Sequence, residues 1–273
     1  MASVSEHSDL EQARSETTDM FKAMLGALGT NSTEVETELF TPGVQPGQPV
    51  QGVIRMRCQD RPVRIKGVAV ELITRAEREY DGREHLVDLA FARQPVFGPF
   101  ELHPGHPLEG RFELRTPWET PITFYNGRHL HGTAVAVRTR VDVDGGFDAA
   151  DTDPIGVGAL PAQHVLLAAV EAWGFGIQHA DVEAGRVDRI PHQLPFFQEI
   201  EFGPSPRLPG LNQLEVTFVA DPHGMYVVLE ADKRALLFSP GRDVQDAIRV
   251  DFATFEQVNW VDVIGQRLHL LAR

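Results

Sequence analysis

The feature that most constrains the fold of this chain is a hydrophobic period of two in residues 135–143. One side of this segment carries Val135, Val137, Thr139, Val141 and Val143, and the other carries Arg138, Arg140 and Asp142. Such alternation is typical of a β-strand that turns one face to a core and the other to water. We therefore expect Val137 to be buried and Arg138 to be solvated.

Similar short segments recur along the chain and predict further strands. They cover residues 33–39, 50–58, 68–72, 87–91 and 112–114 in the first half, and 175–182, 196–202, 214–220 and 225–231 in the second. Gly/Pro turns such as Pro46-Gly47 and Asp221-Pro222-His223-Gly224 separate several of them. No helical pattern lies between the strands of the first half, which argues against a parallel α/β sheet. The pattern indicates an all-β fold of antiparallel sheets packed as sandwiches.

Three segments carry a helical pattern instead. Phe21, Met24, Leu25 and Leu28 form an apolar stripe of a short N-terminal helix that ends at Gly29. A second helix is predicted from Pro161, with Leu166, Ala169, Val170 and Trp173 on one face and Gly174 at its end. A C-terminal helix is predicted to begin at a capping box of Thr254 and Gln257, with Val258, Val261, Gly265, Leu268 and Leu271 near one face.

The length and the breaks in the pattern predict two domains behind a polar extension. Residues 1–19 form an acidic extension that we expect to be disordered. Residues 20–153 form the first β-sandwich with its leading helix, and residues 154–273 form the second with its C-terminal helix. Residues 144–160, which contain Gly145-Gly146 and several aspartates, are expected to be the linker between them.

Composition narrows the classes of partner. The formal net charge is −14, which repels nucleic acid and anionic lipid and suits a basic protein partner. Cys58 is the single cysteine, so no intrachain disulfide can form, as is usual in a reducing compartment. The start of the chain does not have the pattern of a secretory signal, and no apolar run is long enough for a membrane span. We expect a cytoplasmic protein without an integral membrane segment.

Several motifs resemble the bacterial sporulation-control proteins (the stage-zero sporulation protein M-like family). They are Phe21-Lys22-Ala23-Met24-Leu25, residues 46–53 (PGQPVQGV), residues 116–123 (TPWETPIT), residues 168–175 (AAVEAWGF) and residues 194–202 (LPFFQEIEF). The similarity runs from about Met20 to about Lys233. The resemblance implies two tandem arrestin-like, immunoglobulin-like β-sandwiches without a catalytic centre or cofactor. It also implies a regulatory or scaffold role in sporulation or cell development, exerted through binding of proteins.

Two groups of residues suggest alternative, metal-dependent chemistry. His103, His106, His129 and His131 could form a metal site of an enzyme or metal-dependent module, or be ordinary surface histidines. Asp142, Asp144, Asp148 and Asp153 have the spacing of a calcium loop, but Phe147 replaces the turn glycine and Asp153 the usual glutamate. A solvated, self-repelling linker is the simpler explanation of these aspartates. Glu199 and Glu201 share one strand face and are expected to be solvated.

The best candidate for partner binding is the stripe of Phe21, Met24, Leu25 and Leu28. A helix this short does not persist alone in water, so its apolar stripe must pack on something. Either the stripe covers an edge of the first sandwich, or it docks on a partner protein. The C-terminal helix offers the same two roles, edge cover or contact in a homodimer.

Overall fold

The computed structural model describes residues 33–41, 43–146, 148–231 and 247–272, and these residues build two compact units. The first unit contains residues up to Arg75, Asp88–Pro117 and Ala134–Gly158. The second contains Ala76–Val87, Trp118–Thr133 and the chain from Ala159 onward. The chain therefore passes between the units several times, which the sequence pattern does not reveal. The domain boundary expected between Asp153 and Pro154 falls inside a strand, Ala149–Val157.

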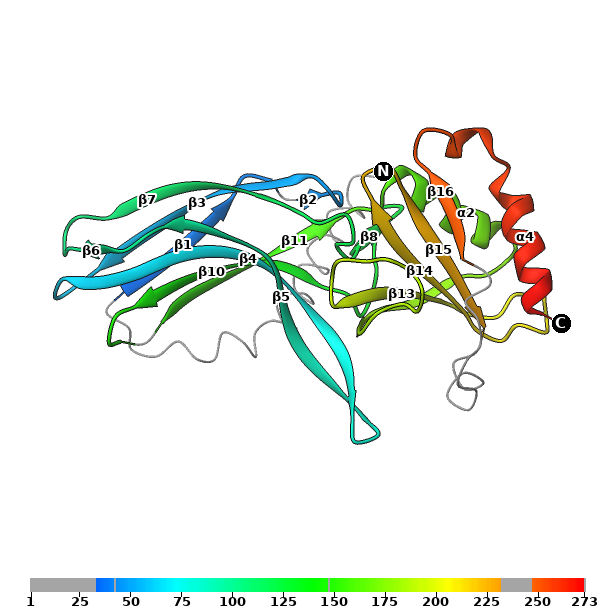
Figure 1. The fold of residues 1–273 in the computed structure, drawn as a ribbon, viewed down its shortest axis with the longest axis horizontal. Helices are drawn as coiled ribbons and strands as arrows, with labels where there is room; N and C mark the ends of the chain where they lie inside the picture. The colour runs from blue at the N-terminus through cyan, green and yellow to red at the C-terminus, as the bar shows by residue number, and fades with distance from the viewer. Residues whose placement is uncertain (1–32, 42, 147, 232–246, 273) are drawn as a thin grey trace, which may run out of the picture. The chain divides into compact units, whose positions relative to one another are not determined.

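The first unit consists of strands, drawn in blue to green in Figure 1. Their bounds are β1 (Thr33–Leu39), β2 (Gly43–Val44), β3 (Pro49–Cys58), β4 (Val63–Tyr80), β5 (Arg83–Phe97), β6 (Phe100–Leu102), β7 (Leu108–Arg115), β10 (Val135–Val143) and β11 (Ala149–Val157). The end of β4 and the start of β5, within Ala76–Val87, belong to the second unit. One sheet has the antiparallel order β1-β3-β7. In the other, β10 lies between β4 and β11, β2 pairs in parallel with β11, and β5 and β6 pair with β4. The predicted all-β architecture is confirmed.

The two sheets of the first unit pack on each other through an apolar interior, and polar contacts of Thr37 also join them. Val135, Val137 and Val141 of β10 have no exposed surface, as the alternation predicted. The Thr37 hydroxyl of β1 lies 2.7 Å from the Thr139 hydroxyl of β10, which links the sheets. Asp151 of β11 accepts the backbone N–H of Thr37 at 2.6 Å. These contacts satisfy polar groups that would otherwise be costly to bury.

The linker predicted over residues 144–160 is wrong. Residues Ala149–Val157 form β11, which pairs with β10 from Val135↔Ile155 to Val141↔Ala149. The acidic residues misled the prediction because aspartate is unfavourable in strands by propensity. Here Asp151 is stabilised by the Thr37 N–H, so tertiary contacts override that local preference.

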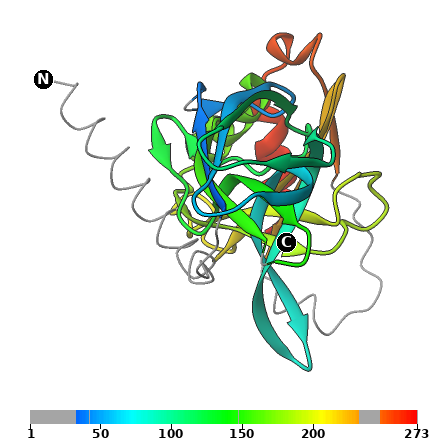
Figure 2. The same cartoon turned by 90° about the vertical axis from the view of Figure 1, so that its left-hand side faces the viewer.

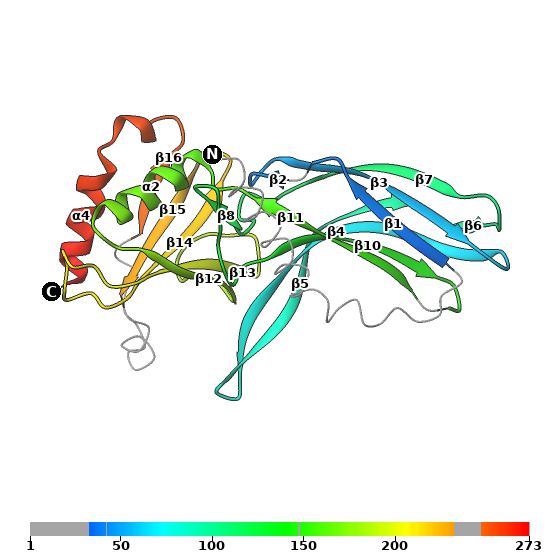
Figure 3. The same ribbon diagram turned by 180° about the vertical axis from the view of Figure 1, so that it is seen from behind.

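The second unit is built on one antiparallel sheet with the order β16-β15-β14-β13-β12, seen from behind in Figure 3. The bounds are β8 (Phe124–Tyr125), β9 (Arg128–His129), α2 (Pro161–Ala172), β12 (Ile177–Ala184), β13 (Phe196–Phe202), β14 (Leu214–Asp221), β15 (Gly224–Ala231), β16 (Ile248–Asp251), the 3₁₀ turn η1 (Phe255–Gln257) and α4 (Trp260–Leu271). The far end of β4 adds to this sheet in parallel, through the pair Glu77↔Glu183. The predicted turn after β14 is confirmed, since Asp221 accepts the N–H groups of His223 and Gly224.

The two described helices differ in how well the sequence predicted them. Helix α2 begins at Pro161 as expected. The capping box of Thr254 and Gln257 is wrong, because Thr254 makes no side-chain cap and only the short turn η1 follows it. Helix α4 instead begins after Asn259, whose side chain accepts the N–H of Asp262. No helix in the described part of the chain is long and apolar enough to cross a membrane.

Helices α2 and α4 lie side by side (Figures 1 and 3), and Gly265 makes this close contact possible. A Cβ atom added to Gly265 would lie 2.1 Å from the indole of Trp173, whose Nε1–H donates to the Val261 carbonyl at 2.8 Å. We expect Gly265→Ala to destabilise the protein by about 1–3 kcal/mol, because the rigid ring must move. This loss exceeds the gain in helix propensity from alanine, about 1 kcal/mol.

Urea denaturation measures this effect, with the neighbouring exposed Gln266→Ala as control. The control should unfold at nearly the same urea concentration as the parent protein. A Gly265→Ala protein as stable as the parent would show that the helices are not packed this closely.

Candidate functional site

The residues that the sequence singled out for binding or reactivity lie partly outside and partly inside the described part of the chain. Phe21, Met24, Leu25 and Leu28 lie outside the described residues, so their role in partner binding stays a prediction. Cys58 is buried, and its thiol donates to the carbonyl oxygen of Leu102 at 3.3 Å. Burial raises the pKa of Cys58, which disfavours the reactive thiolate.

The four candidate histidines are divided between the two units. His103 and His106 lie in an exposed turn of the first unit, where the His106 N–H donates to the His103 carbonyl. His129 and His131 belong to the second unit, with their ring centroids 5.8 Å apart. Within the described residues, the one group of three or more potential ligands consists of carboxylates, and none of the four histidines belongs to it.

The calcium-like spacing of the aspartates is not a calcium loop. Asp142 and Asp144 lie 3.9 and 3.4 Å from the ammonium of Lys66. Asp148 accepts the N–H of Val143, and Asp153 lies in the middle of β11. The carboxylates are therefore distributed along the β10–β11 hairpin rather than around one point.

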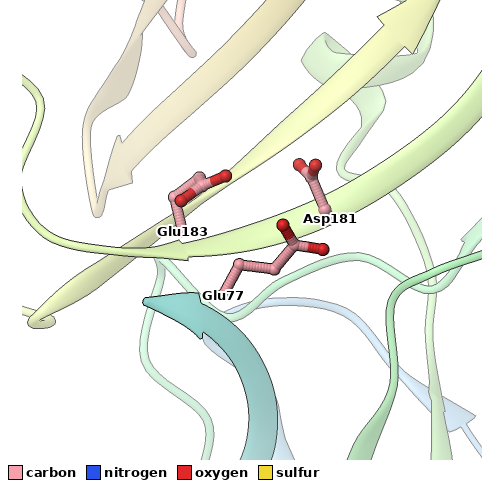
Figure 4. Close-up of side chains that lie close together, drawn as sticks. All are labelled: Glu77, Asp181 and Glu183. Carbon is pink, nitrogen blue, oxygen red and sulfur yellow. The ribbon is translucent and has the colours of Figure 1, made fainter. Parts of the chain in front are cut away.

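The group that the fold does assemble is Glu77, Asp181 and Glu183, which we call the carboxylate cluster. Their carboxylate oxygens lie within 4.8 Å of one another. Figure 4 shows Glu77 at the end of β4 and the other two on the neighbouring strand β12. Glu183 is the direct partner of Glu77 in the parallel pairing, and Asp181 is two residues before it and so on the same face. Asp181 is buried, and the two glutamates are half-buried.

More acidic residues continue across the same face of the sheet. Glu199 lies opposite Asp181, Glu201 opposite His179 and Glu215, and Glu230 opposite Glu215. The prediction that Glu199 is solvated is wrong, because only 5% of the residue is exposed. Strand alternation identified its face correctly, but it could not show that this face of the second unit is also covered. Each of the buried carboxylates Asp181, Glu199 and Glu215 has interaction partners.

The chemistry available to the carboxylate cluster is that of oxygen ligands. Clustered carboxylates suit a hard divalent cation or the cationic side chain of a partner. No nucleophile or histidine belongs to the group, so the geometry does not assemble a base–nucleophile pair of the kind used in covalent catalysis. Exposed acidic groups are common without a bound ion, but Asp181 of this cluster is buried and the two glutamates are half-buried.

The loop between β12 and β13 covers another part of this face. Val187 and Ile190 of the loop pack on Val219 and Val228 of the sheet. Buried in the loop, His192 accepts the Val187 N–H through Nε2 at 3.0 Å, and its Nδ1 lies 3.9 Å from the carboxylate of Glu119. Glu119 also accepts the N–H groups of Gln193 and Leu194, which ties segment 118–133 to the loop.

The pKa of His192 is lowered, mainly because burial disfavours the charged ring; Arg186 adds to this and Glu119 opposes it. The unfolded chain, with an ordinary histidine pKa of about 6.5, therefore binds a proton more readily than the folded chain. The stability that neutral His192 contributes is present above about pH 6.5 and is lost as the pH falls toward the lower folded pKa.

We expect His192→Gln to reduce the loss of melting temperature between about pH 7.5 and pH 5.5, because glutamine can accept the Val187 N–H but does not titrate in this range. The exposed His223→Gln variant should keep the parent slope. An unchanged slope in His192→Gln would show that this histidine is not the source of the acid sensitivity.

The most exposed element is the tip of the β4–β5 hairpin, residues 78–86, every one of which is exposed. Figures 1 and 2 show it in cyan as a ribbon of two strands. Asp81 and Gly82 have φ of 58° and 70°, the positive values of a two-residue hairpin turn. Tyr80 and Leu86 are 72% and 64% exposed. The Asp81-Gly82 pair between alternating segments is the sequence signal for such a hairpin.

Comparison with known proteins identifies the family. The family model described as SpoOM protein (Spo0M) matches residues 21–235. The "Sporulation-control protein spo0M" of Bacillus subtilis is 31% identical over 243 residues, covering 86% of this chain and 91% of that protein. The crystal structure of that sporulation control protein matches with a TM-score of 0.78 at 28% identity, covering 88% of this chain and 99% of the other. The chain therefore belongs to the Spo0M family.

Proposed function

We propose that this chain is a non-enzymatic regulatory or scaffold protein that controls sporulation or cell development by binding other proteins in the cytoplasm. The name of its Bacillus subtilis relative as a sporulation-control protein supports the regulatory role. We further propose that its two units function as tandem arrestin-like domains, as the motif resemblance implies.

The observation that carries the binding role is the exposed tip of the β4–β5 hairpin. Both faces of residues 78–86 are exposed, and the tip presents an aromatic and an aliphatic side chain, Tyr80 and Leu86. Because both side chains are largely exposed, they contribute little apolar burial to the folded core. Exposed aromatic residues are enriched where proteins bind one another.

The proposal is tested by placing a photo-crosslinking amino acid at Tyr80 in cells that enter differentiation. We expect a specific crosslink to another protein, and none from the same probe at exposed Arg61, in the turn between β3 and β4. In parallel, a strain without the gene should show altered development that the parent chain restores and Tyr80→Ser/Leu86→Ser does not. Normal development of the deletion strain, with no crosslinked protein, would refute the proposed function.

A further inference from the structure

The two faces of the β4–β5 hairpin tip differ in charge, which follows from its register. A two-residue turn at Asp81-Gly82 makes Tyr80 and Arg83 the closing pair and places Arg75 opposite Asp88. The contact of 3.1 Å between Arg75 Nε and Asp88 Oδ1 agrees with this register. Because cross-strand partners share a face, the side chains of the tip divide into two sets.

One set is cationic and aromatic, and we call it the arginine face: Arg78, Tyr80, Arg83 and His85. The opposite set contains Glu77, Glu79, Glu84 and Leu86. Within the part of the chain that the structure describes, neither Arg78 nor Arg83 is held in an ion pair. Two arginines on either side of an exposed tyrosine are therefore available in a protein whose net charge is −14.

We propose that the arginine face binds an acidic segment of a partner protein, a refinement that rests on the proposed binding function. Guanidinium groups form strong bidentate hydrogen bonds with carboxylates, and they are planar and permanently charged. Tyr80 between them supplies apolar area for a neighbouring aliphatic side chain of the same segment. The expected ligand is thus a short acidic peptide with an apolar residue between its carboxylates.

The small number of cations on the arginine face favours a short peptide over other anions. Recruitment to anionic membranes or nucleic acid requires several cations over an extended surface, on the order of 4–8 for a lipid-binding cluster. The arginine face has only two arginines and one histidine, and the acidic face of the same hairpin lies directly behind it. An extended polyanion would meet this repulsion, whereas a short acidic peptide contacts the arginine face alone.

The test uses the full-length protein and a short labelled peptide in which aspartate and glutamate alternate with leucine. We expect saturable binding in fluorescence anisotropy, weakened at least about tenfold by Arg78→Glu/Arg83→Glu, since each lost charge-assisted contact contributes a large part of that factor. Arg61→Glu, a charge reversal on another exposed turn, should leave binding unchanged, as should Glu79→Gln/Glu84→Gln on the opposite face.

Equal binding by Arg78→Glu/Arg83→Glu would overturn the inference, as would preferential binding of anionic vesicles or single-stranded DNA. The sequence of the peptide crosslinked to position 80 in cells distinguishes failure of the arginine-face proposal from failure of the proposed protein-binding function. If that peptide is acidic, both proposals stand. If it is neutral or basic, the arginine face is wrongly assigned, while the proposed function as a protein-binding regulator still holds.

Discussion

Replacing Val137 by aspartate should abolish folding of the first unit. The Val137 side chain has no exposed surface and lies opposite Leu72 on β4, which is equally buried. Its neighbour on β11 is Asp153, so a carboxylate at position 137 would be both desolvated and next to another carboxylate. Burial of an unpaired charge costs several kcal/mol, a large fraction of the 5–15 kcal/mol (roughly) that stabilises an ordinary domain.

The measurement is soluble yield together with the melting temperature of any soluble fraction. Arg140→Ala, on the exposed face of the same strand, is the matched control and should behave like the parent protein. A soluble Val137→Asp protein with the parent melting temperature would show that this face of β10 does not belong to the core.

Arg138→Met should be the second strongly destabilising change, although the alternation predicted a solvated position. Arg138 Nη2 lies 2.6 Å from Glu71 Oε1 on β4, and the side chains of Arg138 and Glu71 are only 21% and 4% exposed. The two residues are direct cross-strand partners. Removing the guanidinium leaves a buried carboxylate without its counter-charge, at a cost of about 3–5 kcal/mol.

A double-mutant cycle in urea separates the pair from the side chains themselves. Arg138→Met combined with Glu71→Leu should recover most of the lost stability, because an apolar pair of similar volume often replaces a buried ion pair at little cost. The exposed Arg55, which pairs with Glu38 and Glu109, is the comparison, and Arg55→Met should have little effect. If Arg138→Met behaves like Arg55→Met, the buried ion pair is not important for stability.

These two residues also show how far the sequence alone could lead. Val137 and Arg138 were assigned to opposite faces by the period of two, and the faces are correct. Arg138 does lie on the face opposite Val137, but it is not solvated, because its side chain is only 21% exposed and pairs with Glu71. A strand in the middle of a sheet has neighbours on both sides, and Glu71 on one of them carries the opposite charge at the same register.

The acidic residues of the second half also show that alternation predicts the face of a side chain but not its burial. The glutamates of β13 were correctly placed on one face, but Glu199 is buried. The negative net charge suggested a basic partner, whereas the exposed hairpin tip presents arginines on one face. Net charge averages over the whole surface, so it cannot show which cations the fold leaves free.

The sequence by itself determined many of the strands, their faces and the all-β class, because side-chain alternation and turn-forming residues act over a few neighbouring positions. It also carried the motifs that place the chain in its family. Only the tertiary structure decided which strands pair. The parallel pairing of β4 with β12 brings Glu77 to Asp181 and Glu183, and the pairing of β10 with β11 makes a strand of the expected linker. Pairing between distant segments depends on the closure of long loops and on burial summed over the whole sheet, and no local pattern encodes these quantities.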